Sequence, residues 1–313
     1  MSVQSVLFDA PGPRARARHA VLTVVGVVLV LAVLVGVLLK LRDAGQLQPY
    51  MWLAFLDPVA WTAYLIPGLI GTLMATVVSV VLAGAFGVVF GAGRLSRNPW
   101  IRRPCGIVVE FFRAVPVLIM MIFAFQMFAR SGWFVSSINP LLGVVTGLTL
   151  YNGSVIAELV RSGVHALPAG QREAGLAIGL TDGQTLRNIQ LPQALVAMLP
   201  ALIAQLVVVL KDSALGIAVT YTDLLFWSKT LGSAYANTVP AYIVAAVIYI
   251  ILNYAVIKLA EYVERRLRRT SHVAGPITNA EPTVVQGGGE PGASGAAGFE
   301  DLRGYEEEMR HRA

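Results

Sequence analysis

The sequence predicts an all-α integral membrane protein with six membrane-spanning helices. Of its residues 56% are hydrophobic and only 13% are charged, and the mean hydropathy is +0.67. Soluble domains are more polar than this. A helix needs roughly 20 apolar residues to cross the hydrocarbon core of a bilayer. Six segments meet that requirement, at about residues 20–39, 66–91, 106–129, 139–160, 196–217 and 240–260.

The first apolar segment, residues 20–39, contains no charged residue. Basic residues flank it on both sides: Arg14, Arg16 and Arg18 before it, and Lys40 and Arg42 after it. A cleaved signal peptide is the alternative, but its apolar core is usually about 7–15 residues and a small-residue cleavage site follows. The longer core and the basic flank favour a retained transmembrane helix.

Basic residues outside the spans concentrate in alternate loops. One set precedes the first span, separates the second from the third and the fourth from the fifth, and ends the sixth: Arg14, Arg16, Arg18, Arg94, Arg97, Arg102, Arg103, Arg161, Arg172, Arg187, Lys258, Arg265, Arg266, Arg268 and Arg269. The other loops hold only Lys40, Arg42, Arg130 and Lys229. Because arginine and lysine concentrate in cytoplasmic loops, both termini and the loops 92–105 and 161–195 are predicted to be cytoplasmic.

The segments outside the spans divide into a basic cytoplasmic N-terminal tail (1–19), an external loop (40–65) and a C-terminal tail (267–313). The external loop is rich in aromatic residues: Trp52, Phe55, Trp61 and Tyr64. Such residues favour the headgroup level, which predicts a segment lying on the membrane surface. The C-terminal tail is rich in glycine, alanine and proline, and we expect it to be disordered and cytoplasmic.

The cytoplasmic loop 161–195 carries signals for a first short helix. Pro168 suits the first position of a helix because its missing N–H has no intrahelical acceptor there. The run Ala-Gly-Gln-Arg-Glu-Ala-Gly-Leu-Ala-Ile follows, and Gly179 is placed to end the helix in a left-handed cap.

A second helix is predicted directly after this glycine. Thr181 is a candidate N-cap, and Gln184 follows at the spacing of a capping box. The helix from Asp182 is expected to stop before Pro192, since proline disfavours helix in the preceding residue. The loop is therefore predicted to form a helix, a glycine turn, a short helix and a proline exit, although an ordinary amphipathic connector has the same periodicity.

The same loop resembles the "EAA" loop of ATP-binding-cassette importer permeases. The resemblance is carried by Glu173-Ala174-Gly175, by Gly179 and by Ile189-Gln190-Leu191-Pro192. The family pattern is Glu-Ala-Ala, a later glycine and an Ile-x-Leu-Pro ending. Gly175 departs from it, since the family has alanine there.

The resemblance extends over about residues 68–266, where the chain is similar to the polar amino-acid permeases of that family. Four stretches carry it in order: TLMATVVSVVLAGAFGVVFGAGRLS, FFRAVPVLIMMIFAF, AELVRSGVHALPAGQREAG and LKDSALGIAV. It implies a type I ATP-binding-cassette importer permease fold over residues 66–266, with a five-span core. The helix 20–39 and the C-terminal tail lie outside this core. Within that family the chain resembles glutamate-uptake permeases of high-GC Gram-positive bacteria, and glutamine and aspartate are the next substrates considered.

The chain itself lacks a phosphate-binding loop, because none of its four lysines follows a glycine. The resemblance implies that ATP and Mg²⁺ are bound by a partner dimer of ATPase subunits, and that this chain has no cofactor, metal or catalytic residue of its own. The other partners implied are a second permease copy or a sister permease, an extracellular amino-acid-binding (lipo)protein and the lipid bilayer, without nucleic acid. Nine residues are expected to couple the chain to the ATPase: Glu173, Ala174, Gly175, Gly179, Leu180, Thr181, Asp182, Leu191 and Pro192.

Charged groups at membrane depth are costly and are therefore candidates for the substrate pathway. Four residues are proposed: Arg113, Glu158, Lys211 and Asp212. Glu158 is a candidate partner for an ammonium group, and Arg113 or Lys211 for a carboxylate. Two of them also stand at helical i, i+3 spacing from an opposite charge, as Glu110–Arg113 and Glu158–Arg161, so each pair could simply neutralise itself.

Two alternatives remain open on the sequence. An ion-coupled secondary transporter would need no ATPase, but it would normally show acidic relays at the bilayer midplane. A non-transporting membrane scaffold would need no Glu-Ala-Gly to Leu-Pro spacing. Within the spans, Pro116 and Pro200 are expected to introduce kinks.

Overall fold

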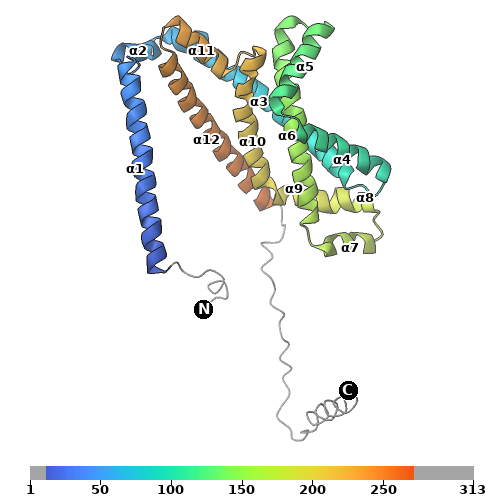
Figure 1. Cartoon of the computed structure of the whole chain (residues 1–313). Helices are drawn as coiled ribbons and strands as arrows, with labels where there is room; N and C mark the ends of the chain where they lie inside the picture. The colour runs from blue at the N-terminus through green and yellow to red at the C-terminus, as the bar shows by residue number, and fades with distance from the viewer. Residues whose placement is uncertain (1–11, 271–313) are drawn as a thin grey trace, which may run out of the picture. The chain divides into compact units, whose positions relative to one another are not determined.

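The computed structural model describes residues 12–270, and all regular structure in that range is helical (Figure 1). The predicted C-terminal tail lies outside the described residues except for its first four, which extend the last helix to Thr270. Five helices are long and apolar enough to cross a membrane, or up to six if one bent helix pair counts as a span. The prediction of an all-α membrane protein is therefore confirmed.

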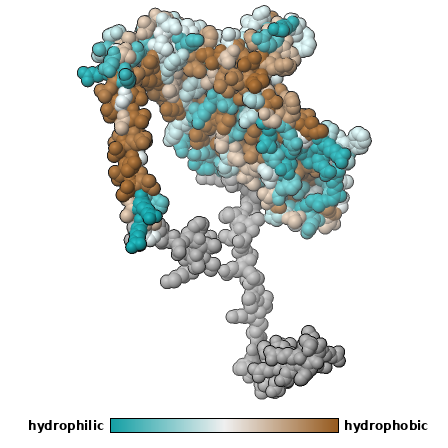
Figure 2. All heavy atoms as spheres, in the orientation of Figure 1, coloured by the Kyte–Doolittle hydropathy of each residue, from teal (hydrophilic) through white to brown (hydrophobic). Residues whose placement is uncertain are grey.

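The first span is α1 (Pro13–Asp43), a single helix with Lys40 and Arg42 in its last turn. None of its most apolar 18-residue window is buried within the described residues. Figure 2 shows that hydrophobic residues cover this helix along most of its length. Because no residue of this window is buried, α1 adds nothing to the core of the described residues. A helix that is apolar on all sides is expected to face lipid or another membrane helix.

The external loop is ordered rather than extended coil. It contains α2 (Pro49–Leu53), the 3₁₀ turn η2 (Ala54–Leu56) and the π-helical segment η3 (Ala60–Leu65). Two hydrogen bonds tie it to the turn after α11 (Leu224–Ala234): the Tyr235 hydroxyl donates to Asp57 at 2.9 Å, and the Asn237 amide donates to the Met51 carbonyl at 2.9 Å.

The core is built on α3 (Ile66–Arg94), α5 (Val117–Ser131) and α6 (Asn139–His165). Glycines four residues apart let α5 approach α6 closely. A Cβ at Gly143 would lie 2.7 Å from Phe125 Cβ, and one at Gly147 would lie 2.6 Å from Met121 Cγ. Small residues at this spacing drive helix association in membranes, where the hydrophobic effect between helices is weak.

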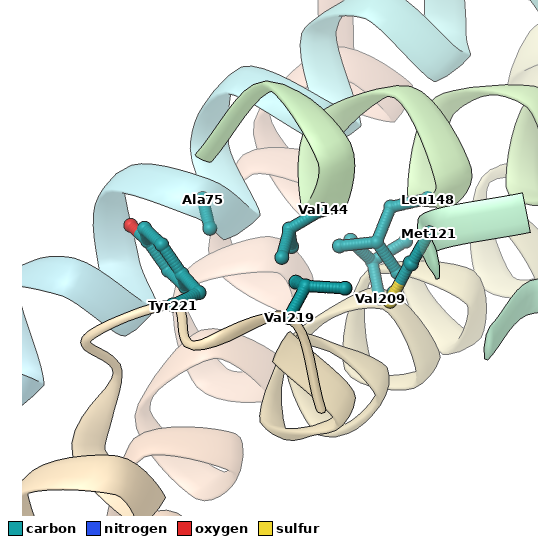
Figure 3. Close-up of a cluster of buried hydrophobic side chains, with 7 residues drawn as sticks. All are labelled: Ala75, Met121, Val144, Leu148, Val209, Val219 and Tyr221. Atoms are coloured by element: carbon teal, nitrogen blue, oxygen red, sulfur yellow. The ribbon is translucent and has the colours of Figure 1, made fainter. Parts of the chain in front are cut away.

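One buried cluster joins these helices to α10 and the segment that follows it (Figure 3). Its members are Ala75, Met121, Val144, Leu148, Val209, Val219 and Tyr221. They come from α3, α5, α6, α10 (Leu199–Asp212) and η6 (Ser213–Val219), with Tyr221 just beyond η6.

The third predicted span, residues 106–129, is not one helix. The structure has α4 (Pro99–Ala114) and α5, bent by 102° at the break between them. Val115 is extended (φ −83°, ψ 129°) because it precedes Pro116 and a proline disfavours helical ψ in that residue. The predicted kink at Pro116 is confirmed, but it is a full break.

The last two spans are α10 with η6, covering Leu199–Val219, and α12 (Thr238–Thr270). The predicted span 196–217 is interrupted at Met198, between α9 (Leu191–Ala197) and α10, and Pro200 stands just after this break. It is the second residue of α10, where its missing N–H leaves no hydrogen bond unmade.

Candidate functional site

The polar insert begins with α7 (Ala169–Ala177), one residue after the proline predicted to open it. Pro168 is the N-cap, and Gly179 has φ +85°. The Leu180 N–H donates to the Gly175 carbonyl at 3.1 Å, and the Gly179 N–H donates to the Leu176 carbonyl at 3.0 Å. These two bonds form a Schellman motif, so the predicted left-handed glycine cap is confirmed.

The second helix starts as predicted, with a capping box at α8 (Asp182–Thr185). The Thr181 hydroxyl accepts from the Gln184 N–H at 3.3 Å, and the Gln184 side chain accepts from the Thr181 N–H at 2.8 Å. The capping box thus provides acceptors for two N–H groups at the helix start, those of Thr181 and Gln184.

The predicted stop before Pro192 is wrong. The chain passes from α8 through the π-helical segment η5 (Leu186–Gln190) into α9 (Leu191–Ala197) without leaving the helix. Pro192 is the second residue of α9. A proline removes an N–H from the helical ladder, and the wider π turn just before it, closed by the Leu191 N–H on the Leu186 carbonyl, accommodates that loss.

Gly175, the departure from the family pattern, lies at the closest approach of α7 to α8 and η5. It is buried, and an added Cβ would lie 2.6 Å from Thr185 Cγ2, 2.8 Å from Thr185 Oγ1 and 3.1 Å from Ile189 Cδ1. Thr185 is itself fully buried. Since carbon atoms normally pack about 3.5–4.0 Å apart, the insert has its present geometry only with glycine at this position.

The last turns of α7 and the turn into α8 expose four of the nine expected coupling residues. These are Glu173, Ala174, Gly179 and Thr181. Leu180 and Asp182 are partly buried. Ile178, which the sequence reasoning missed, is 75% exposed at the tip of this turn. The only sequence signal for it was an isoleucine directly before the capping glycine.

Leu191 and Pro192 lie away from this tip. Leu191 packs against a buried cluster of Ala83, Ile156 and Val160 from α3 and α6. The Gln193 amide also donates to the Gln171 side chain at 3.1 Å, which links α9 to α7. Leu191 therefore fastens the insert to the core, whereas Pro192 is exposed, as are Glu173 and Ala174.

Asp182 is the centre of a second attachment. Its carboxylate lies 2.8 Å from Arg97, in the turn between α3 and α4, and 3.0 Å from Arg172 on α7. These residues line a cavity of about 780 Å³ between that turn, the end of α6 and the insert. The sequence predicted only that Arg97 and Arg172 are cytoplasmic, and it did not predict their contact with Asp182.

Five charged residues of α3, α4 and α6 form one network. Glu158 lies 2.6 Å from Arg94, 3.5 Å from Arg113 and next to Arg161. Glu110 pairs with Arg94 at 3.2 Å. The predicted Glu158–Arg161 pair is confirmed, whereas Glu110 and Arg113 bind partners on other helices instead of each other.

The other pathway candidates, Lys211 and Asp212, are not part of this network. They end α10, where Lys211 is exposed and Asp212 is partly buried. No ion pair joins either of them to another residue within 12–270. The structure thus brings Arg113 and Glu158 together and leaves Lys211 and Asp212 apart.

A buried carboxylate lies in the segment between the last two spans. Asp223 is fully buried, and its side chain caps α11 by accepting from the Phe226 N–H at 2.8 Å. Burial raises the pKa of Asp223 to about 6. The Tyr221 hydroxyl donates to the Gly71 carbonyl at 2.7 Å, and the Leu224 N–H donates to Thr72 at 3.0 Å, so this segment is fixed to α3.

Comparison with known proteins assigns this architecture to one group. Residues 83–269 match the family model described as "Binding-protein-dependent transport system inner membrane component". The glutamate transport system permease protein GluD of Corynebacterium glutamicum is 48% identical over 228 residues, which are 73% of this chain and 84% of that protein. The probable glutamine ABC transporter permease protein GlnP of Bacillus subtilis is 28% identical over 207 residues, which are 65% of this chain and 94% of that protein.

A solved structure gives the same result for the fold. A chain from the crystal structure of an amino acid ABC transporter with histidines superposes with a TM-score of 0.60 at 28% identity. The match covers 68% of this chain and 98% of that chain. The match to the family model, residues 83–269, does not include α1.

Proposed function

This chain belongs to the family of binding-protein-dependent transport system inner membrane components, and from that premise we propose that it works as the amino-acid permease subunit of an ATP-binding-cassette importer. The single observation that carries the proposal is the insert 169–197, a helix–turn–helix that is fastened to α3 and α6 at one end and exposed at the other. The multiple apolar helices make the chain a multi-pass membrane component.

The exposed end of the insert is the proposed contact with an ATPase subunit. Ile178 supplies an apolar anchor at the tip, and Glu173 on the preceding helix is exposed without an ion-pair partner in residues 12–270. A central apolar side chain with a polar rim is the usual arrangement of an interaction hot spot. ATP and Mg²⁺ would be bound by the partner, and their hydrolysis would supply the energy.

The fixed end of the insert is the proposed transmission element. Leu191 is packed on α3 and α6, and Asp182 is bridged to the α3–α4 turn through Arg97. A displacement of the tip would therefore move two parts of the membrane domain together. Such rigid-body coupling can alternate a permease between outward-open and inward-open states.

Glutamate is the favoured substrate, with glutamine and aspartate next. The similarity to a relative named as a glutamate transport permease supports this, as does the charge of the α3–α4–α6 network, in which three arginines meet two glutamates. Glu158 is occupied by arginines, so an ammonium-binding role for it requires one of them to move aside. Arg113, Lys211 and Asp212 remain candidates for the pathway.

The remaining partners follow from the same family membership. We propose that a binding protein delivers the amino acid from outside, and that a second permease chain, identical or sister, completes the pathway. The arginine distribution supports cytoplasmic termini and a cytoplasmic insert.

Reconstitution would test the proposal. The full chain with its ATPase subunits is placed in vesicles with ATP inside and the binding protein with labelled glutamate outside, and uptake is measured against vesicles containing an ATPase subunit disabled in its phosphate-binding loop. We expect uptake only with the active subunit. Uptake driven by an ion gradient without ATP would support a secondary transporter, and absence of both uptake and bound ATPase would support a scaffold.

A further inference from the structure

The helix α4 carries an apolar surface that no other described element covers. Trp100 is 87% exposed, Ile107 is 68% exposed and Phe111 is 59% exposed. The bend of 102° before α5 turns α4 far from the direction of the span that follows. A helix with large exposed apolar side chains and basic residues is typical of one lying in a membrane interface.

Arginines on α4 stand beside this surface without partners. Arg102 and Arg103 are exposed, and neither forms an ion pair with a residue in the range 12–270. They line a cavity of about 410 Å³ together with Arg94 and Arg161, and the only acidic lining residue is Glu110. Arg94 and Arg161 are already paired with Glu158, so Arg102 and Arg103 supply the unpaired positive charge of this cavity.

A second cavity of about 320 Å³ adjoins the first one. It is lined by Pro99, Trp100, Arg103, Pro104 and Ile107, so Arg103 and Ile107 belong to both cavities. The cationic cavity and this more apolar cavity therefore have two lining residues in common. Figure 2 shows hydrophilic side chains gathered over the end of the molecule that holds α4, α7 and α8.

We propose that this pair of cavities binds an anionic phospholipid. Its phosphodiester and headgroup would bind Arg102 and Arg103, and its acyl chains would pass over Trp100 and Ile107. Guanidinium groups bind phosphate oxygens through paired N–H donors, which suits an arginine-lined site. The adjoining apolar wall distinguishes a lipid from a soluble anion, and it also favours lipid over an acidic protein surface.

The test compares lipid retention among charge variants of the full chain purified with its ATPase subunits. The complex is equilibrated in mixed micelles of phosphatidylglycerol and phosphatidylcholine, and the ratio of the two lipids retained is measured by native mass spectrometry. Arg102→Gln with Arg103→Gln should lower the retained ratio roughly 30-fold, from about 1 kcal/mol for each arginine. Arg102→Lys with Arg103→Lys, which keeps the charge, should retain most of the preference.

The matched control is Arg14→Gln with Arg18→Gln, which removes the same charge from exposed positions at the start of α1. An equal loss of lipid preference in this control would mean unspecific attraction and would overturn the proposal. Displacement of the lipid by millimolar inorganic phosphate or ATP would assign the cavity to a soluble anion and would also overturn it. Loss of ATPase subunits from the glutamine variant with an unchanged lipid ratio would assign the arginines to the protein partner instead. None of these readings depends on the transported substrate.

Discussion

Replacing Gly175 with alanine tests whether the insert needs a close approach between its two helices. The new methyl carbon would lie 2.6 Å from Thr185 Cγ2 and 2.8 Å from Thr185 Oγ1. Threonine is β-branched and stiff at χ1, and Thr185 is fully buried, so it cannot rotate away easily. The clash must therefore be relieved by moving α7 away from α8.

The magnitude follows from two opposing effects. Overpacking of a well-packed site costs about 1–3 kcal/mol, whereas glycine to alanine within a helix gains about 0.5–1 kcal/mol. The net loss for Gly175→Ala is thus on the order of 1–2 kcal/mol in the packing of α7 on α8. In a background with Thr185→Ala, both short contacts disappear and Ile189 Cδ1 at 3.1 Å becomes the nearest of these atoms. There the same substitution should be neutral or stabilising.

The assay is a double-mutant cycle on the reconstituted importer. Thermal melting of the complex, recovery of the ATPase subunits and glutamate uptake per ATP hydrolysed are measured for the parent, both single variants and the double variant. We expect Gly175→Ala to lower the melting temperature and uncouple hydrolysis from uptake, and Thr185→Ala to restore both. Strictly additive effects, or no effect of Gly175→Ala in the parent, would refute the steric explanation.

Four further substitutions test the other parts of the site. Ile178→Asp should reduce the recovered ATPase subunit at least tenfold (on the order of 1.4 kcal/mol or more) with an unchanged elution volume of the permease, and normal recovery would remove Ile178 from the contact. Asp182→Asn breaks two partly exposed ion pairs, each contributing about 0.2–1 kcal/mol, so the melting temperature should change little while uptake per ATP falls; unchanged coupling would argue against the bridge to the α3–α4 turn. Glu158→Gln leaves neighbouring arginines uncompensated and should lower the melting temperature, and unchanged uptake affinity and rate would exclude Glu158 as the ammonium partner. Because burial raises the pKa of Asp223 to about 6, the folded protein binds a proton that the unfolded chain releases between about pH 4 and 6. Thermal stability should therefore fall as the pH rises through this window, and Asp223→Asn should flatten that part of the profile; an identical profile would contradict the burial argument.

Local signals in the insert were sufficient to predict much of its structure. The φ of +85° at Gly179 and the capping box of Thr181 with Gln184 depend on hydrogen bonds between residues a few positions apart. Such hydrogen bonds can be predicted from the sequence because the groups involved are neighbours along the chain. Hydropathy likewise predicted the spans, since the bilayer requires long apolar helices whatever their packing.

The effects of Pro192 and Pro116 on the helices around them could not be predicted from local sequence alone. Both were expected to disturb a helix, but one is absorbed by a π turn and the other breaks a span by 102°. A proline only removes one hydrogen bond and restricts the preceding residue. Whether the chain bridges the gap or turns depends on the helices packed around it.

The sequence by itself predicted an all-α membrane chain with a polar, capped insert that resembles those of importer permeases. Only the tertiary structure decided which charges meet, because Arg94 and Glu158 are 64 residues apart and Arg97 and Asp182 are joined across two spans. The structure also explains why residue 175 is glycine: a Cβ there would clash with Thr185, a contact that spacing along one helix cannot reveal. Periodicity fixes the face of each helix, but pairing between faces depends on close packing across the whole bundle.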